Sequence, residues 1–334
     1  MRKLLLNNLK ILNYRNVREA NLVFHPKINA FFGDNAQGKT NLLDAIYVLG
    51  YTKSYLLRSD IDNILSGESH YHISSNILNN NEDNELILAY HDSKKKLLKK
   101  NGKEMKKLSD HIGFLPVVII SPYDADLITG ASDLRRKFID ASISFYNPMY
   151  LQCLMDYNKS LKLKNKVLKE DHIDIDVLKS INVNLAKFAD YIETERISYF
   201  ELFNPIFQKL YSQLASENEE PFIEYISTCK DGSSYLESME AEIHAEIRSR
   251  HALVGIHRDD FKMQLKGLDA KRYASQGQQK SLLIALKLTK FAVLKDKIDA
   301  EPILLLDDIF DKLDKSRVKN LMNILKGTGY GQLF

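Results

Sequence analysis

The chain has 334 residues, 44% of them hydrophobic and 27% charged, which is ordinary for a soluble globular protein and long enough for about two domains. The formal net charge is only +3, so attraction to nucleic acid must come from where the charges lie. The two cysteines, Cys153 and Cys229, exclude a disulfide framework and a cysteine-based zinc site, and no apolar run is long enough to span a membrane. We therefore expect a cytoplasmic protein.

The first strands are predicted from alternating side chains. Residues 4–14 and 18–25 alternate apolar and polar residues on either side of a turn near Asn16, as half-buried antiparallel strands do. Residues 28–32 form a short apolar run that is typical of a buried strand, and residues 41–47 have a helical pattern. The loop between that strand and that helix carries the first chemical motif.

Residues 33–40 match in full the phosphate-binding pattern of a glycine, four free positions and Gly-Lys-Ser/Thr. Gly33 and Gly38 let the backbone curl close to phosphate oxygens, which its N–H groups and the helix N-terminus would bind. Lys39 would reach the β- and γ-phosphates as a catalytic cation, and the Thr40 hydroxyl would bind the accompanying Mg²⁺. The predicted ATP-binding residues are Gly33, Asp34, Asn35, Ala36, Gln37, Gly38, Lys39, Thr40 and Asn41. The alternative, a chance glycine-rich turn, is disfavoured by the flanking strand and helix.

A basic hairpin is predicted next. Residues 96–100 and 103–108 flank Asn101-Gly102, the strongest short-range signal for a type I′ turn. Its lysines are Lys94, Lys95, Lys96, Lys99, Lys100, Lys103, Lys106 and Lys107. They fit two interpretations equally well: a solvated sheet edge that repels other strands, or a surface that contacts DNA phosphates.

The middle of the chain changes to helical periodicity. Residues 116–120 read as a strand, residues 132–144 as a helix, and residues 148–214 as long helices with few glycines. Lys159, Lys162, Lys166 and Lys169 recur at helical spacing on one face. A solvated face is the favoured reading of this stripe alone, but two basic surfaces on one chain favour nucleic-acid binding.

Further strands and helices follow. Residues 221–228 read as a strand, Ser234 and Glu237 form a capping box before a helix, and Phe261, Met263 and Leu265 alternate along another strand. We therefore expect an α/β fold in which residues 1–120 and 245–334 form an ATPase head. Residues 121–244 would be an inserted, mainly α-helical domain.

Two acids end an apolar strand near the end of the chain. Residues 303–308 read Ile-Leu-Leu-Leu-Asp-Asp, the pattern by which a parallel strand delivers a carboxylate to the magnesium beside a phosphate loop. Asp307 would hold the metal, and Asp308 would orient or deprotonate the attacking water as the catalytic base. An ordinary strand with a polar end is the alternative, which the complete phosphate loop disfavours.

A second anion site is predicted where residues 275–279, Ser-Gln-Gly-Gln-Gln, open a long helix. Ser275, Gly277 and Gln278 place donors at a helix N-terminus. Because one ATP needs only one phosphate loop, this second site implies a second molecule of the protein.

These motifs together resemble the ATP-binding-cassette ATPases, in their SMC-like DNA-repair branch. In that family a Ser-x-Gly-Gln signature contacts the γ-phosphate held by the opposing subunit, and Ser275, Gly277 and Gln278 match it. Residues 310–314, Phe-Asp-Lys-Leu-Asp, resemble the family's D-loop. Residues 121–124, 135–140 and 254–260 are similar to three further segments of the RecF family of bacterial recombination mediators, from which Tyr123 and Ile256 depart. The family pattern also continues beyond the position of Phe334.

The resemblance implies an ATP-dependent DNA-binding protein of recombinational repair and replication restart. Two molecules would close around two ATPs and bind double-stranded and single-stranded DNA at gaps and junctions. They would help mediators of the RecO and RecR type to load the RecA recombinase. A weak, DNA-stimulated ATPase activity would reopen the dimer, so ATP would act as a switch.

Two other functions fit parts of the sequence. The chain could be the ATPase subunit of an ABC-type membrane transporter, although the lysine-rich hairpin and residues 254–260 speak against this. An SMC-type structural protein with long coiled-coil arms is a third possibility. The inserted segment is too short for such arms, since each helical residue adds only about 1.5 Å.

Overall fold

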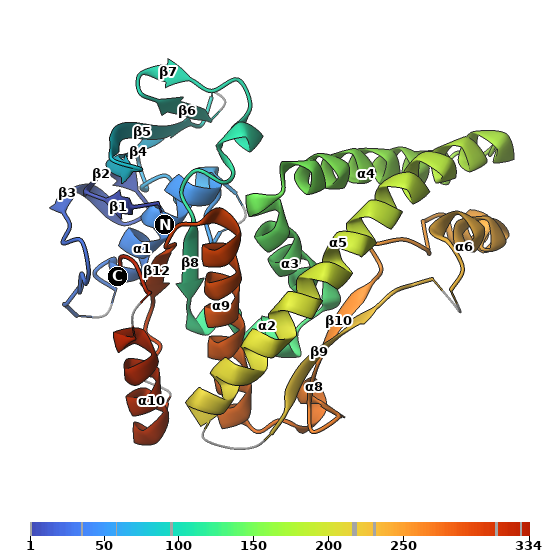
Figure 1. The fold of residues 1–334 in the computed structure, drawn as a ribbon. Coiled ribbons are helices and arrows are strands. Elements are labelled where there is room, and N and C mark those ends of the chain that lie inside the picture. The colour runs from blue at the N-terminus through green and yellow to red at the C-terminus, as the bar shows by residue number, and fades with distance from the viewer. Residues whose placement is uncertain are drawn as a thin grey trace. The chain divides into compact units, whose positions relative to one another are not determined.

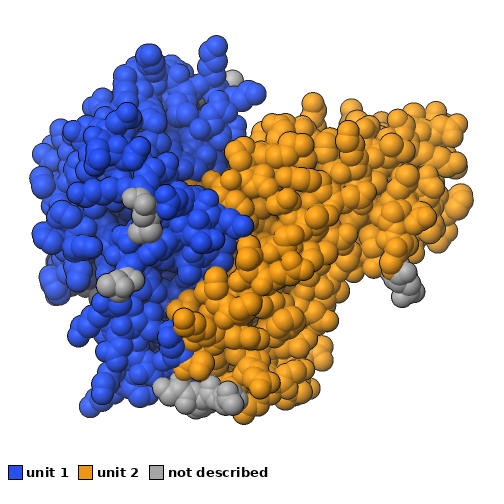
Figure 2. Space-filling model, in the orientation of Figure 1, with its two compact units in different colours: residues 1–124, 213–215, 284–334 blue, residues 125–212, 216–283 orange. Residues whose placement is uncertain are grey.

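The structure is a computed structural model that describes residues 2–34, 36–57, 59–93, 96–215, 219–229, 232–310, 313–327 and 329–334. The chain forms two compact units (Figure 2). Unit 1 comprises residues 1–124, 213–215 and 284–334, and unit 2 comprises residues 125–212 and 216–283. The units therefore change over after residues 124, 212, 215 and 283, whereas the sequence analysis places the inserted domain at residues 121–244. Residues 245–283 group with the helical unit.

Unit 1 contains an antiparallel sheet with the strand order β3-β2-β4-β5-β6-β7, in which β1 also pairs with β4 (Figure 1). Its strands are β1 (Leu4–Leu6), β2 (Asn8–Tyr14), β3 (Val17–Val23), β4 (His70–Asn79), β5 (Glu82–His91), β6 (Leu97–Lys100) and β7 (Lys103–Glu104). Alternate residues of β2, such as Leu9 and Ile11, are buried while Lys10 and Leu12 are exposed, as the sequence pattern predicts. Strand β4 was not predicted, although Tyr71, Ile73 and Ile77 alternate with more polar residues there.

The second sheet of unit 1 is parallel and buried. Strands β8 (Val117–Ile120) and β12 (Ile303–Leu306) pair in parallel with Ile303 opposite Val117. All four residues of β8 are buried, which explains why both strands are continuous apolar runs. The last residues of the chain extend this sheet, because the Leu304 N–H donates to the Gln332 carbonyl at 3.0 Å and the Phe334 N–H donates to the Leu304 carbonyl at 2.9 Å.

Unit 1 also contains helices. They are α1 (Lys39–Tyr51), α10 (Lys315–Lys326) and the second part of α9 (Gln276–Ile298). Short 3₁₀ turns lie at Ile61–Asn63, Leu108–His111 and Pro122–Ala125, the last of which ends in unit 2. From Leu43 to Tyr51 every residue of α1 except Tyr47 is buried, so the helix after the phosphate loop is anchored in the core.

The predicted buried strand at residues 28–32 is wrong. Only Ile28 makes a bridge, to Leu333, and Ile28 and Phe32 are 67% and 91% exposed. Within the described part of the chain, no strand pairs with the other side of this segment. Its apolar side chains therefore stay in contact with solvent, although the segment still leads into the phosphate loop.

Unit 2 combines long helices with a three-stranded antiparallel sheet in the order β11-β10-β9. Its strands are β9 (Pro221–Ile226), β10 (Asp260–Leu265) and β11 (Leu268–Asp269). Its helices are α2 (Asp126–Thr129), α3 (Ser132–Tyr146), α4 (Pro148–Val167), α5 (Ile175–Ala215, except its last three residues), α6 (Tyr235–Ala241), α7 (Ile243–Ser249), α8 (Ala270–Tyr273) and the start of α9. Among the helices of the described residues, none is both long and apolar enough to cross a membrane.

The long helices confirm the periodicity read from the sequence. Helix α4 begins where the Asn147 side chain accepts a hydrogen bond from the Tyr150 N–H and Pro148 occupies the first turn. Helices α4 and α5 fold back on each other as a hairpin (Figure 1). The predicted capping box of Ser234 and Glu237 is also confirmed, but the helix it opens divides into α6 and α7 at Glu242.

Candidate nucleotide site

The phosphate loop curls as its glycines allow. Gly33, Ala36 and Gly38 all have positive φ angles, of 151°, 65° and 97°. A Cβ on Gly38 would lie 2.8 Å from the Asn16 side chain, so glycine is required there by both conformation and space. The Lys39 ammonium donates to the carbonyls of Gly33 and Asp34 at 2.7 and 2.8 Å. The lysine thus closes over the loop, while Asn35 lies outside the described residues.

Asn16 braces this loop from the turn between β2 and β3. Its amide donates to the Ala36 carbonyl at 3.0 Å, and its carbonyl oxygen accepts a hydrogen bond from Asn41 at 2.5 Å. One side chain therefore contacts both the loop and the first turn of α1. The sequence analysis used Asn16 only as a turn signal, since nothing in its spacing indicates a contact with the loop.

The two predicted magnesium ligands meet. The Thr40 hydroxyl donates to Asp307 Oδ1 at 2.9 Å, although the two residues lie near opposite ends of the chain. Asp307 is buried, and its burial raises the pKa of its carboxyl group while the hydrogen bonds from Thr40 and Ser121 oppose this. Asp308, the next residue, is exposed and has a φ of 51°. The Asp307 carboxylate is therefore fixed by hydrogen bonds, whereas Asp308 is exposed to solvent.

These residues fit a magnesium-bound triphosphate. A hydroxyl and a carboxylate oxygen are the hard ligands that Mg²⁺ prefers, and Mg²⁺ usually takes one or two protein ligands beside substrate phosphates. Among the described residues there is no group of three or more His, Cys, Asp or Glu side chains that could hold a metal alone. The glycine loop and Lys39 supply the matching positive side of the site.

A buried polar cluster behind the site was not predicted. Asp44 on α1 accepts hydrogen bonds from the Tyr14 hydroxyl at 2.6 Å, the Ser54 hydroxyl at 2.7 Å and the Tyr55 N–H at 2.7 Å. Arg15 lies 3.7 Å from the same carboxylate. Asp44 is fully buried, so these donors replace water around its charge.

A second buried pair joins this cluster. The Lys287 ammonium on α9 lies 2.6 Å from Asp124 Oδ1 and donates to the Tyr55 hydroxyl at 3.0 Å. Both charged side chains are at most 5% exposed. The sequence signal for Asp124 was the family resemblance of residues 121–124, and Lys287 lies in a helical run with no distinguishing pattern.

The signature segment begins α9 in unit 2. Ser275 Oγ accepts from the Gln278 N–H at 3.3 Å, and the Gln278 side chain accepts from the Ser275 N–H at 2.7 Å, which makes a capping box. Gln278 also donates to Glu219 at 2.6 Å. The two side chains predicted as anion donors thus already have partners, at the N-terminus of α9 and, for Gln278, also on Glu219. Ser275 is exposed, and its hydroxyl proton can still be donated to a ligand.

The comparisons with known proteins agree with these features. The family model described as RecF/RecN/SMC N terminal domain matches residues 5–334. A DNA replication and repair protein RecF from Parabacteroides distasonis is 40% identical over 339 residues, which cover 99% of this chain and 90% of that protein. The chain belongs to the RecF family. The RecF of Flavobacterium johnsoniae is also 40% identical, over 98% of this chain and 92% of that protein.

Solved structures confirm the predicted fold class. The recombination mediator protein RecF with ATP has a TM-score of 0.92 and 28% identity, over 99% of this chain and 91% of that one. The Smc head domain of Pyrococcus furiosus has a TM-score of 0.56 at 15% identity, over 100% of this chain and 89% of that one, and so indicates the fold alone. This RecF-family chain has the ABC/SMC-type head of an ATPase.

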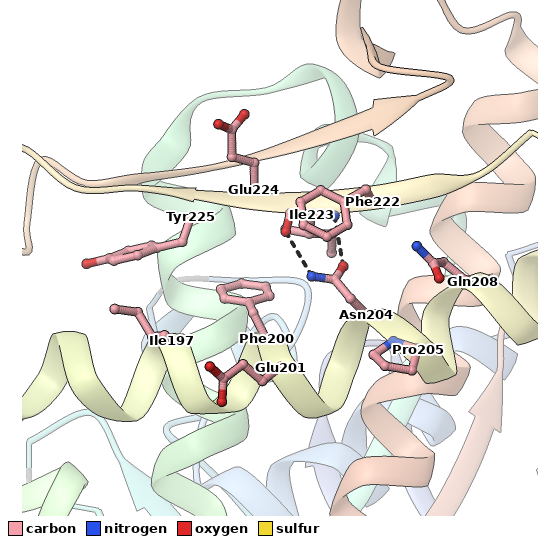
Figure 3. Close-up of a pocket in the computed structure, with 10 residues that line it drawn as sticks. All are labelled: Ile197, Phe200, Glu201, Asn204, Pro205, Gln208, Phe222, Ile223, Glu224 and Tyr225. Atoms are coloured by element: carbon pink, nitrogen blue, oxygen red, sulfur yellow. Dashed lines mark hydrogen bonds between the residues drawn. The ribbon is translucent and has the colours of Figure 1, made fainter.

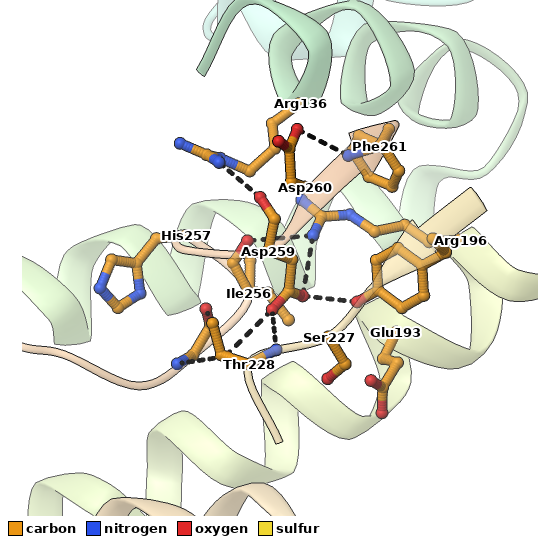
Figure 4. A network of polar contacts seen from close by, with 12 residues as sticks. Arg136, Glu193, Arg196, Ser227, Thr228, Ile256, His257, Asp259, Asp260 and Phe261 are labelled. Atoms are coloured by element: carbon orange, nitrogen blue, oxygen red, sulfur yellow. Dashed lines mark hydrogen bonds and ion pairs between the residues drawn. The ribbon is translucent and has the colours of Figure 1, made fainter. Parts of the chain in front are cut away.

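The remaining RecF-family segments build the polar core of unit 2 (Figure 4). Arg196, which is fully buried, donates to Asp140 through Nε and Nη2 and to the Ile256 carbonyl through Nη1 at 3.0 Å. The Asp259 carboxylate accepts from the Thr228 N–H at 2.9 Å and lies 3.5 Å from Arg196. Residues 135–140 and 254–260 therefore meet as structural partners, and Lys137 and Arg258 are exposed charges among them.

Unit 2 also has a groove of about 440 Å³ between α5 and β9 (Figure 3). It is lined mainly by apolar side chains, including Phe200 and Phe222. Asn204 bonds the Ile223 N–H at 2.9 Å and the Ile223 carbonyl at 3.0 Å, which satisfies this part of the free edge of β9. None of the predicted site residues of this RecF-family chain lines the groove.

The two basic surfaces of the RecF-family chain differ in structure. The predicted hairpin forms, with Asn101 and Gly102 at φ angles of 52° and 75°, but two of its lysines are not free. Lys96 bonds Thr52 and Asp60, and the Lys100 ammonium lies 3.7 Å from the centre of the Phe114 ring. Lys94 and Lys95 lie outside the described residues. On the other surface Lys159, Lys162, Lys166 and Lys169 are all exposed, the last just beyond the end of α4.

Proposed function

We propose that this chain is an ATP-dependent DNA-binding protein of recombinational repair and replication restart, in which ATP closes a dimer. The contact between Thr40 and Asp307 at 2.9 Å carries this proposal. It joins the first turn after a complete phosphate loop to the end of a buried parallel strand, which is the arrangement that a magnesium-bound triphosphate requires.

The residues of unit 1 would bind the nucleotide. The backbone of residues 33–41 would receive the phosphate oxygens, and Lys39 would exchange the carbonyls of Gly33 and Asp34 for the β- and γ-phosphates. Thr40 and Asp307 would hold Mg²⁺, which supplies charge neutralisation on the phosphates when bound. Asp308 is exposed and could hold and deprotonate the attacking water.

The signature segment of unit 2 would complete the site of a second copy. Its support is the exposed capping box of Ser275 and Gln278 at the N-terminus of α9, with Gly277 between them. A helix N-terminus attracts an anion through its N–H groups and dipole. Dimerisation would therefore depend on the γ-phosphate. Weak, DNA-stimulated hydrolysis of ATP would reopen the dimer.

The partners are proposed from the named relatives. The similar proteins are DNA replication and repair proteins, and the similar structure at 28% identity is of a recombination mediator in the RecFOR pathway. We therefore propose double- and single-stranded DNA at gaps, mediators of the RecO and RecR type, and RecA indirectly. Membership of this family favours the DNA-repair interpretation over the transporter alternative.

The exposed lysines of α4 allow a test of DNA binding. Changing Lys159, Lys162 and Lys166 to Gln should weaken ATP-dependent retention of duplex DNA and flatten its salt dependence, because each lost phosphate contact removes about 0.9 from the slope of log K against log salt. Gel shifts with ATP, with ADP and without nucleotide, across several salt concentrations, measure both quantities.

A triple variant with Gln at Lys315, Lys319 and Lys326 is the matched control. It removes the same charge from exposed positions on α10. It should keep the wild-type slope. If wild-type protein retained no duplex DNA with ATP at low salt, the proposed function would be wrong.

A further inference from the structure

Both oxygens of Asp307 are held by hydroxyl groups from different elements. Thr40 on α1 donates to Oδ1 at 2.9 Å, and Ser121, directly after β8, donates to Oδ2 at 3.2 Å. Asp307 and Ser121 are 6% and 1% exposed, so water does not compete for these bonds. The side chain of Asp307 therefore has its rotation fixed from two sides.

Ser121 is itself fixed by a charged pair. Its N–H donates to Asp124 Oδ2 at 2.9 Å, and Asp124 Oδ1 lies 2.6 Å from the Lys287 ammonium. Lys287 in turn reaches the Tyr55 hydroxyl at 3.0 Å. The turn after β8 is thus tied to α9 and to the Asp44 cluster behind α1.

Metal binding would affect the two hydrogen bonds to Asp307 differently. Thr40 is the expected ligand, so its contact with Asp307 would be rearranged around the metal. Ser121 bonds the oxygen that faces away from Thr40 and can keep that bond. A hydrogen bond to the outer oxygen of a ligating carboxylate sets its direction and strengthens its hold on the metal.

We propose that Ser121, held in place by Asp124 and Lys287, is a positioning residue that aims the Asp307 carboxylate at the magnesium of the bound nucleotide. This inference rests on the proposed function of the site. It assigns Ser121 no contact with the nucleotide. The inference also assigns a role to the buried Asp124–Lys287 ion pair. Two hydrophobic residues could fill the same space, but they could not fix Ser121.

The test is the magnesium concentration that half-saturates nucleotide binding. Ser121→Ala should bind a fluorescent ATP analogue in EDTA as the wild-type protein does, but need about tenfold more Mg²⁺ for the Mg²⁺-dependent gain in affinity. Ser121→Thr keeps the hydroxyl and should restore the wild-type requirement. Ser75→Ala is the matched control, because Ser75 is a buried serine of unit 1 that bonds the Asn8 carbonyl on β2.

Each outcome decides a separate claim. If Ser121→Ala and Ser75→Ala need the same Mg²⁺, the positioning role is wrong. Should the alanine variant fail to fold, Ser121→Cys keeps the volume with a weaker donor and should show a smaller rise in the same direction, while no rise would overturn the inference. Wild-type protein that binds the analogue equally with and without Mg²⁺ would contradict the proposed function itself.

Discussion

At the residue scale, two buried lysines on α9 stand out. Lys287 and Lys290 lie on the same helix, and the Lys290 ammonium is 5.4 Å from the centre of the Tyr51 ring. Burial, together with the positive charge of Lys287, lowers the pKa of Lys290 to about 7, against the opposing effect of Asp124. Unit 1 thus contains a buried group that changes its charge near neutral pH.

This pKa makes the stability of the protein depend on pH. Between pH 7 and 10.5 the unfolded Lys290 holds its proton and the folded one does not, so the unfolding free energy rises with pH. The contribution is at most about 1.4 kcal/mol per pH unit. Lys290→Met lacks this rise. The unfolding free energy of Lys290→Met minus that of the wild type should therefore fall as the pH increases from about 7 to about 9.

Urea unfolding at several pH values measures the difference. Lys326→Met, at an exposed position on α10, is the control and should stay parallel to the wild type. A constant gap between Lys290→Met and the wild type would show that Lys290 keeps its proton in the folded state.

At the element scale, the segment at residues 331–334 joins β12 to the run of residues that leads into the phosphate loop. Leu333 bridges both Ile28 and Leu304, so the segment lies between the run before the phosphate loop and β12. Gln332 fixes it to β1: its side chain accepts from the Leu6 N–H at 2.8 Å and donates to the Leu6 and His25 carbonyls at 2.9 and 3.0 Å.

Gln332→Leu should therefore destabilise unit 1. The change leaves the buried Leu6 N–H without its side-chain partner, and we expect a loss of about 3 kcal/mol because each buried polar group left unpaired costs about 1–3 kcal/mol. Chemical unfolding measures this loss. Gln213→Leu, at an exposed position on α5, should change the stability by less than about 0.5 kcal/mol. Equal effects of the two variants would contradict the structural role of Gln332.

Local patterns predicted most elements, and pairing partners explain the exceptions. The β10 alternation and the Asn101-Gly102 turn are encoded in neighbouring residues, so they could be read directly. The run at residues 28–32 is apolar but exposed because its burial depends on a neighbouring strand, which local sequence does not specify. Likewise Thr40 and Asp307 were found through their motifs, whereas Asn16, Ser121 and Lys287 depend on contacts between distant segments.

At the scale of the whole molecule, the residues predicted to bind ATP are distributed over the two units. The phosphate loop, Thr40 and Asp307 belong to unit 1, and Ser275 and Gln278 belong to unit 2. Helix α9 has residues in both units, since it begins in unit 2 at the signature and ends in unit 1. Under the proposed function, the first group binds nucleotide in one copy and the second group closes the site of another.

Ser275→Arg separates these two steps. A long cation at the tip of α9 should block the approach of a second copy but leave ATP binding in unit 1 unchanged. The substitution also removes a helix cap, which costs about 1 kcal/mol. Ser234→Arg removes the cap of the other capping box in unit 2, on α6, and controls for that loss. It should dimerise like the wild type.

Sedimentation velocity with a non-hydrolysable ATP analogue and Mg²⁺ tests the central claim most directly. We predict that the wild type and Ser234→Arg sediment as dimers with the analogue and as monomers without it, while Ser275→Arg remains a monomer although it binds the analogue. A wild-type protein that stays monomeric when saturated with the analogue, or a Ser275→Arg variant that dimerises normally, would contradict a site completed by a second copy.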